Sequence, residues 1–405
     1  MKKIVFVSPV LEHPAAGGPQ LRIENTIKAL SNIAELHIVS LMNKQGLGGD
    51  AAETFYRGYA HSFSYAPSIT PSPVRKVLYG IARRIGVNQR QHDDAMFLRR
   101  MMDRIGADIL WVGYGNVSYP LISAVRAMHP AAKIVCDTDS VWSRFILREL
   151  EVETDPLRRE SIAREGTAKE KEERQSASIC DVTTAVSEVD ASYYRDIAPC
   201  AEQIHICSNV IDLDTYTTHH APPAGFISPA LFLGGSYYDP HSPMVRAAQW
   251  VVAEVMPHVL SRHPNTHLYL VGRGSDTHCR NLAGPNVTVT GKVETVLPYL
   301  QNSVCSLVPL QFESGTRFKI LESGACRKAL VSTTLGAEGI PVTHGQDILI
   351  ADNAQEFAQA IVSLISNPDL ARKLGEECRT LVDRNYSLTS LSREIASIIE
   401  YLTQK

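Results

Sequence analysis

Short apolar runs rich in β-branched residues alternate along the chain with longer stretches in which apolar residues recur every three or four positions. The short runs predict buried strands, and the longer spacing predicts amphipathic helices such as 21–30. A strand followed by a helix, repeated many times, is typical of an α/β protein whose parallel sheets are covered by helices. The predicted strands are 3–8, 36–41, 109–112, 134–137, 182–186, 230–234, 268–272, 287–290, 306–309, 329–332 and 348–350.

The alternation breaks at residues 209–223, which are polar and contain prolines. This break divides the chain into a first doubly wound domain at 1–208 and a second at 209–385. We expect the last helix, 386–405, to pack back on the first domain. Doubly wound domains bind ligands at the carboxyl ends of their strands, so we expect a binding site in a cleft where two such domains face each other.

The charge balance argues against a nucleic-acid partner. The 405 residues include 40 Lys and Arg against 43 Asp and Glu, a formal charge of −3, so no excess positive charge opposes a phosphate backbone. Eight cysteines occur without a Cys-x-x-Cys pair, which favours reduced thiols in a cytoplasmic protein over disulfides or a zinc site. No apolar stretch approaches the ~20 residues of a membrane-spanning helix.

Two charged stretches are interpreted as surface segments. Residues Arg75 to Arg104 form a basic, amphipathic segment that is either a solvated helix face or a peripheral contact with the inner face of a membrane. The stretch from Arg148 to Arg174 mixes both signs densely, which predicts one long exposed helix with i,i+4 ion pairs and no catalytic role.

The segment 312–325 is the most informative for chemistry. A Ser314-Gly315-Thr316 turn follows a predicted strand and precedes a helical pattern, so its backbone N–H groups form an anion site. Arg317 and Lys319 add two cations where a helix start by itself favours acidic residues, which indicates an anionic ligand such as a diphosphate. Glu322 then lies where a carboxylate accepts hydrogen bonds from ribose hydroxyls. The alternative is an ordinary capped helix with a surface Lys319–Glu322 pair.

This segment, followed by 329–339, resembles the donor-binding part of GT-B glycosyltransferases, specifically the retaining GT4 (glycosyltransferase group 1) family. Matching pieces occur in the family's order at 17–18, 185–188, 209–212, 232–236, 269–272 and 287–291. The resemblance implies two Rossmann-like domains and a nucleotide-diphospho-sugar, with UDP or GDP, held by the second. It also implies a glycan, glycolipid or lipid-linked acceptor held by the first, no metal or other cofactor, and a setting in surface polysaccharide assembly.

The residue pattern and the resemblance together suggest the roles of individual residues. Arg317 and Lys319 would stabilise the β-phosphate leaving group, and Asp139 would assist near the acceptor hydroxyl or the reacting carbon. The donor-binding residues would be Gly17, Gly18, Gly235, Ser236, Gly272, Val293, Ser314, Gly315, Thr316 and Glu322.

The sequence departs from the family's pattern at three places. The family sets two glutamates eight positions apart, but the position eight before Glu322 is Ser314, with Glu313 one place earlier. The Arg and Lys that usually grip the diphosphate near Gly235 and Ser236 are missing, so Arg317 and Lys319 take that role in our interpretation. Asp139 stands where many relatives have a histidine.

Three alternatives remain open at the level of sequence. Asp137-Thr-Asp139 spells the Asp-x-Asp with which GT-A transferases hold a divalent cation, although it also suits a strand-end aspartate that caps the next helix. The chain could instead be a UDP-sugar epimerase on the same fold. It could also be a noncatalytic sugar-nucleotide-binding partner of a transferase complex.

Overall fold

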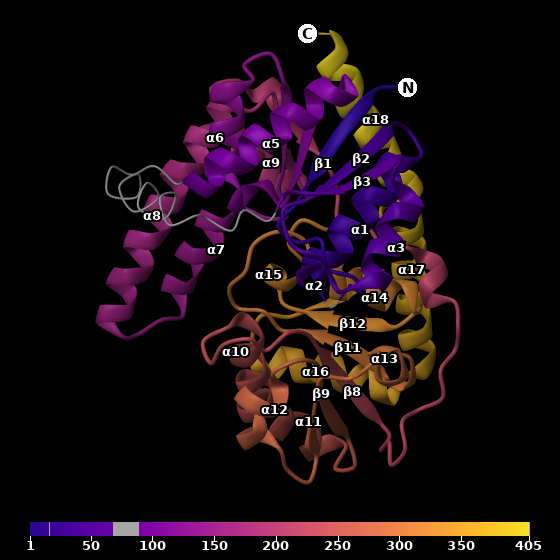
Figure 1. Ribbon diagram of the computed structural model, residues 1–405. Coiled ribbons are helices and arrows are strands. Elements are labelled where there is room, and N and C mark those ends of the chain that lie inside the picture. Colours follow the sequence, from indigo (N-terminus) through magenta and orange to yellow (C-terminus); the bar gives the residue numbers. More distant parts are fainter. Residues whose placement is uncertain (16, 68–88, 405) are drawn as a thin grey trace. The chain divides into compact units, whose positions relative to one another are not determined.

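The computed structural model describes residues 1–15, 17–67 and 89–404. The chain divides into two compact units (Figure 1). The first comprises Met1–Ser143, Arg164–Ser208 and Leu391–Lys405, and the second comprises Arg144–Ala163 and Asn209–Ser390. Each unit contains one parallel sheet covered by helices, so the predicted α/β class with two doubly wound domains is confirmed.

The first sheet has seven strands in the order β3-β2-β1-β4-β5-β6-β7. They are β1 (Lys3–Val7), β2 (Glu35–Ser40), β3 (Ser62–Tyr65), β4 (Ile109–Gly113), β5 (Lys133–Asp137), β6 (Val182–Ala185) and β7 (Ile204–Ile206). The helices between them are α1 (Gly18–Ser31), α2 (Lys44–Leu47), α3 (Asp50–Tyr59), α5 (Gln89–Ile105), α6 (Tyr119–Met128), α7 (Trp142–Arg148), α8 (Pro156–Ile179) and α9 (Glu188–Ile197).

Both faces of the first sheet are buried, as a doubly wound sheet requires. Successive side chains of a strand point to opposite faces. Val5 and Val7 of β1 therefore join Leu110 and Val112 of β4 in the core beneath α5 and α6, which pack against each other.

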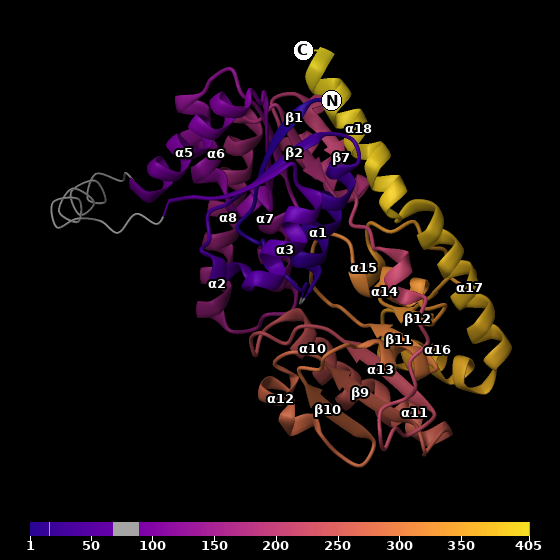
Figure 2. The same cartoon turned by 45° about the vertical axis from the view of Figure 1, so that its right-hand side comes forward.

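The second sheet has six strands in the order β10-β9-β8-β11-β12-β13. They are β8 (Ala230–Gly234), β9 (His267–Val271), β10 (Val287–Gly291), β11 (Cys305–Val308), β12 (Ala329–Ser332) and β13 (Leu349–Ile350). The helices are α10 (Pro243–Trp250), α11 (Met256–Arg262), α12 (Ser275–His278), α13 (Leu297–Asn302), α14 (Phe318–Ala325), α15 (Thr334–Ala337), α16 (Ala354–Ser366) and α17 (Pro368–Asn385). Helix α11 packs against α16, and α14 packs against α17 (Figure 2).

Every strand that the sequence predicts is present, with ends within one residue of the prediction. The sequence analysis missed β3 and β7. Both lie at the ends of the first sheet, where each strand has only one neighbour.

The stretch from Arg148 to Arg174 is not one helix, contrary to the prediction. Helix α7 ends at Arg148, a short 3₁₀ turn spans Glu149–Glu151, and α8 begins only at Pro156. Proline is favoured in the first turn of a helix because it has no N–H to leave unpaired there. Residues Arg144–Ala163 also group with the second unit, so the division does not fall at residue 208 alone.

The last helix, α18 (Leu388–Gln404), contacts the first unit near the end of β7. The Tyr401 ring lies 4.6 Å from the His205 ring, centroid to centroid. The Glu394 carboxylate accepts hydrogen bonds from the backbone N–H of Ser208 at 2.7 Å and from its hydroxyl at 2.8 Å.

Within the described ranges, no helix is long and apolar enough to cross a membrane. The part of the basic segment before residue 89 lies outside the described residues, and the rest belongs to α5. All eight cysteines are free thiols, and all but Cys200 and Cys326 are buried.

Candidate functional site

The loop between β11 and α14 leaves the second sheet at its topological switch point. From β8 the chain proceeds outward to β9 and β10 on one side, and from β11 to β12 and β13 on the other. Connections that leave two neighbouring strands in opposite directions open a crevice at the strands' carboxyl ends, where doubly wound sheets bind ligands. The loops after β8 and after β11 border that position, and they contain the residues around Gly235 and Ser314.

Arg317 holds the loop after β11 in place. Its guanidinium donates hydrogen bonds to the carbonyl oxygens of Ser314, at 2.9 Å, and of Gly315. It also donates to the carbonyl oxygen of Leu335 in α15 at 3.2 Å. Arg317 is 5% exposed, so its charge is engaged beneath the surface by two carbonyls of the loop and one of α15. Arg317 is therefore the residue that shapes this loop.

Several backbone N–H groups of the same segment are unpaired within the described part of the chain. The N–H groups of Gly315, Thr316, Phe318 and Lys319 have no acceptor among the residues that the structure describes. Gly315 has a φ of 77°, a conformation that side chains disfavour. Unpaired N–H groups before a helix favour an anion, so this loop keeps the geometry on which the predicted anion site depends. Helix α14 begins at Phe318, two residues later than Thr316.

The Lys319 side chain extends from the first turn of α14 toward the loop after β8. Its Cε lies 3.0 Å from where a Cβ on Gly235 would stand, so the stem packs over that glycine. Within the described part of the second unit, no group accepts a hydrogen bond from its ammonium. Burial lowers the pKa of Lys319, although Glu313 and Glu322 act to raise it. Burying an ammonium that has no partner among the described residues is costly, so this environment favours an anionic ligand.

The glycines beneath Lys319 allow close packing of two loops. Gly272, after β9, has a φ of 132°, and a Cβ there would lie 2.0 Å from the carbonyl oxygen of Gly235. Gly235 in turn donates its N–H to the carbonyl oxygen of Val271 at 2.9 Å. Ser236 follows, half-buried. Gly235, which packs against Gly272, is therefore the floor on which the stem of Lys319 lies.

Glu322 lies one turn along α14 from Lys319. Its Oε1 accepts a hydrogen bond from the Tyr216 hydroxyl at 3.1 Å. Burial raises the pKa of Glu322, against the opposing charge of Lys319. The second carboxylate oxygen has no donor among the described residues, so it is available to a ligand hydroxyl.

The sequence analysis missed an ion-pair cluster that supports the same loop. Arg148 donates to the Glu313 carbonyl oxygen at 2.7 Å and binds both carboxylate oxygens of Glu338, at 2.6 and 2.7 Å. Arg144 adds a contact to Glu338 at 3.4 Å. Burial acts to raise the pKa of Glu338, but these arginines outweigh it and the pKa is lowered. No sequence signal identifies this pairing, because its partners are far apart along the chain.

Two further residues of the predicted set belong to the second unit. The hydroxyl of Thr316 accepts a hydrogen bond from the side-chain amide of Asn209 at 2.9 Å. Val293 follows β10, two strands away from β8 in the sheet, and packs against the core beside Phe232 and Tyr269. The structure therefore gathers Gly235, Ser314–Lys319 and Glu322, but not Val293.

Asp137 and Asp139 lie in the first unit and have different surroundings. Asp137 is fully buried and accepts hydrogen bonds from Arg22, from Trp111 at 3.1 Å and from Thr184 at 2.8 Å. These donors occupy both of its oxygens, so Asp137 is part of the core and does not suit the alternative Asp-x-Asp metal site. The described residues contain no cluster of His, Cys, Asp or Glu suited to a metal ion.

Asp139 is less enclosed than Asp137. Its Oδ1 accepts hydrogen bonds from Asn116 at 2.6 Å and from Trp142 at 3.3 Å. Burial raises its pKa, against the lowering effect of Asn116. The carboxylate is thus held in a fixed orientation just beyond β5.

Gly17 and Gly18 lie at the start of α1 in the first unit. Gly18 is the first helical residue, and Gly17 caps the helix with extended backbone. A Cβ on Gly17 would make only ordinary contacts, the nearest at 3.6 Å from Gln20. Packing within the unit therefore does not require glycine at this position, and the close approach of a ligand to Gly17 stays a prediction.

Comparison with known proteins gives a family match for part of the second unit. Residues 231–367, which contain all of α14 and the loop before it, match the family model described as glycosyl transferases group 1. An uncharacterized 44.6 kDa protein in the cps region of Klebsiella pneumoniae is 22% identical over 146 residues. That alignment covers 34% of this chain, and the chain spans only 38% of the length of that relative.

Two solved structures share the fold over nearly the whole chain. Sucrose-phosphate synthase from Thermosynechococcus elongatus aligns with a TM-score of 0.71 at 14% identity, covering 100% of both chains. HepE from Anabaena, solved in complex with UDP and glucose, aligns with a TM-score of 0.65 at 12% identity, covering 99% of this chain and 100% of HepE. At such identities the likeness concerns the fold.

Proposed function

We propose that the protein is a retaining glycosyltransferase. The chain has the GT-B fold, and its residues 231–367 match the glycosyl transferases group 1 family. It would move a sugar from a nucleoside diphosphate donor to an acceptor hydroxyl. One observation carries the proposal. Lys319, whose ammonium has no partner within the described second unit, belongs to the first turn of α14, whose N–H groups are unpaired and which follows β11 at the switch point of the second sheet.

The donor diphosphate is the anion that this site fits. When the bond between the anomeric carbon and the β-phosphate oxygen breaks, negative charge grows on that phosphate. Lys319 and the N–H groups near Gly315 and Thr316 are fixed in advance and stabilise that charge as it develops. Arg317 acts through the loop, since its guanidinium binds loop carbonyls. The structure of HepE with UDP-glucose supports a uridine diphosphate donor.

Transfer proceeds with retention in this proposal. The acceptor oxygen bonds to the anomeric carbon from the face that the leaving group vacates, and its proton passes to the departing phosphate oxygen. This path requires neither an enzyme nucleophile nor a cofactor. Asp139, oriented by Asn116, assists the acceptor hydroxyl or balances the charge of the reacting carbon.

The setting we propose is the assembly of a surface polysaccharide or glycoconjugate. It is supported by the relative in the cps region of Klebsiella pneumoniae.

A nucleotide screen tests the donor class first. Thermal stabilisation should be largest with one of UDP, GDP, ADP, CDP and TDP, because a ligand that binds only the folded state raises its stability. The matching labelled sugar nucleotide is then incubated with and without a glycan acceptor. An isomerised sugar nucleotide without acceptor would identify an epimerase, and nucleotide binding with no turnover at all would identify a noncatalytic partner.

Glu322→Gln should weaken binding of the preferred nucleoside diphosphate by about tenfold, the range for a hydrogen bond to a charged group. The amide keeps the oxygen that accepts from Tyr216 but removes the charge offered to the ribose. Titration calorimetry measures the affinity. Glu376→Gln on α17, whose partner is the exposed Arg327, is the matched control and should bind like the unmodified protein. Equal affinity in both variants would exclude Glu322 from the donor site.

Treatment with a chelator should leave the transfer rate unchanged, because protein cations and N–H groups supply the phosphate stabilisation that a metal would otherwise give. The rate is measured after EDTA treatment and again after Mg²⁺ or Mn²⁺ is restored. Strict dependence on the added cation would contradict the proposed mechanism.

A further inference from the structure

The first unit contains a pocket of about 330 Å³ at the carboxyl ends of its central strands. It lies at the switch point of the first sheet, since the chain proceeds from β1 to β2 and β3 on one side and continues with β4 on the other. Val7 and Ser8 come from the end of β1, Val112 from β4, and Leu41 from the end of β2. The loop after β11, Lys319 and Glu322 play no part in this pocket, because they belong to the second unit, and Gly17 and Gly18 do not line it.

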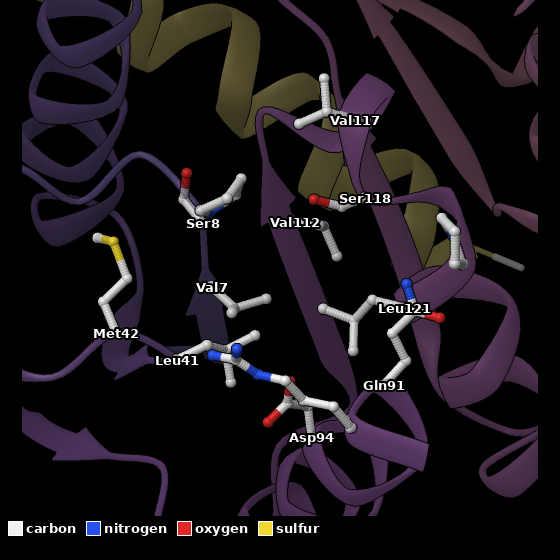
Figure 3. A pocket seen from close by; sticks show the side chains of 13 residues that line it. Val7, Ser8, Leu41, Met42, Gln91, Asp94, Val112, Val117, Ser118 and Leu121 are labelled. Atoms are coloured by element: carbon white, nitrogen blue, oxygen red, sulfur yellow. The ribbon is translucent and has the colours of Figure 1, made fainter. Parts of the chain in front are cut away.

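The interior of the pocket is apolar. Figure 3 shows Val7, Leu41, Val112 and Leu121 extending into the same space from different elements. Val117, which is 38% exposed, stands at another part of the lining. An opening lined in this way favours a ligand that brings apolar surface of its own.

Three of the five polar side chains that line the pocket belong to α5, and the other two are Ser8 and Ser118. Asp94 contributes a half-buried carboxylate, and no described residue donates a hydrogen bond to it. Burial raises the pKa of Asp94, and the nearby charge of Arg90 acts to lower it. A carboxylate and a guanidinium beside an apolar interior suit the hydroxyls of a sugar or another polar head group.

We propose that this pocket binds the acceptor, and that the acceptor is amphiphilic, with an apolar chain seated among Val7, Leu41, Val112 and Leu121 and a hydroxylated head group held by Asp94. The proposal rests on the proposed function, of which it specifies the acceptor class. A purely polar glycan acceptor would leave the apolar surface of the pocket without a complementary partner.

The size of the pocket fits such an occupant. Ligand pockets in proteins have volumes of roughly 300–1,000 Å³, so 330 Å³ suits a short alkyl or isoprenoid segment rather than a whole long lipid. Each methylene that leaves water contributes about 0.8 kcal/mol, or about a fourfold gain in affinity. Affinity should therefore rise with chain length over a few methylenes and then level off when the pocket is full.

A homologous series of n-alkyl β-glucosides, from methyl to octyl and below the micelle concentration, tests this by titration calorimetry. In the unmodified protein the affinity should increase by about fourfold per methylene until it levels off. Val117→Trp, which places an indole at the pocket, should reduce the gain per methylene to less than about twofold. Val189→Trp, at an equally exposed position on α9 outside the pocket, is the matched control and should keep the full gain.

A second variant tests the head-group side. Asp94→Asn should weaken binding of every glucoside by a similar factor while leaving the gain per methylene intact, whereas Asp103→Asn, farther along α5, should change neither. An affinity that does not depend on chain length, or an equal dependence in the two tryptophan variants, would overturn the proposal. Binding of the preferred nucleoside diphosphate is measured on the same samples, so failure of the donor site is recognised separately from failure of this pocket.

Discussion

Replacing Lys319 with methionine should lower the rate of sugar transfer by ~100-fold or more, the effect of removing one preorganised donor from a developing oxyanion. Methionine keeps an unbranched apolar stem that can still lie over Gly235, so the floor formed by Gly235 and Gly272 should persist. The loss therefore reports the ammonium alone. Transfer is measured with the sugar nucleotide that the screen identifies.

Lys328→Met is the matched control for Lys319→Met. Lys328 belongs to the same unit, its pKa is also lowered by burial, and it donates to the carbonyl oxygen of Ser303 at 3.1 Å, away from the loop after β11. Its replacement should leave the rate per folded molecule close to that of the unmodified enzyme. Equal transfer rates in Lys319→Met and Lys328→Met would show that Lys319 does not stabilise the leaving group.

Arg317→Met should have a comparable effect, a ~100-fold or greater loss of turnover, for a different reason. The guanidinium is bound to the carbonyls of Ser314, Gly315 and Leu335, so its loss frees the loop that presents the N–H groups. A misplacement of about 1 Å of a hydrogen-bonding N–H group is enough to lower the rate by about 100-fold. Turnover is measured together with the unfolding temperature.

The conservative variant separates position from charge at Arg317. Arg317→Lys keeps the charge but cannot bridge three carbonyls, so it should remain defective if Arg317 acts by holding the loop. Arg327→Met, which removes an exposed arginine just after α14, is the control and should retain activity. Full activity in Arg317→Lys would contradict a positioning role and favour a direct charge on the phosphate.

The central strands were predictable because each is a buried apolar run between turn residues, as with Ala230–Gly234 and Ala329–Ser332. The two missed strands are short and lie at the edges of the first sheet. In Ser62–Tyr65 a serine alternates with an aromatic ring, and Ile204–Ile206 spans only three residues, so neither carries a pattern long enough to recognise.

Residue types and spacing were enough to locate the loop before α14 but not to orient its side chains. Arg317 and Lys319 look equivalent in sequence, yet one turns back to its own loop and the other extends over Gly235. That choice depends on contacts with β8 and α15, which are distant along the chain. The Arg148–Glu338 pair is hidden for the same reason, since the sequence between these residues says nothing of their proximity.

The central claim, that Lys319 binds the donor diphosphate, is tested most directly by titration calorimetry. The affinities for UDP and for uridine are measured in the unmodified protein and in Lys319→Met. If Lys319 binds the diphosphate, the ratio of the UDP affinity to the uridine affinity should fall by at least about tenfold in the variant. The affinity for uridine should stay the same. An unchanged ratio of the two affinities, in a variant that still binds uridine, would show that the diphosphate lies elsewhere and would contradict the account.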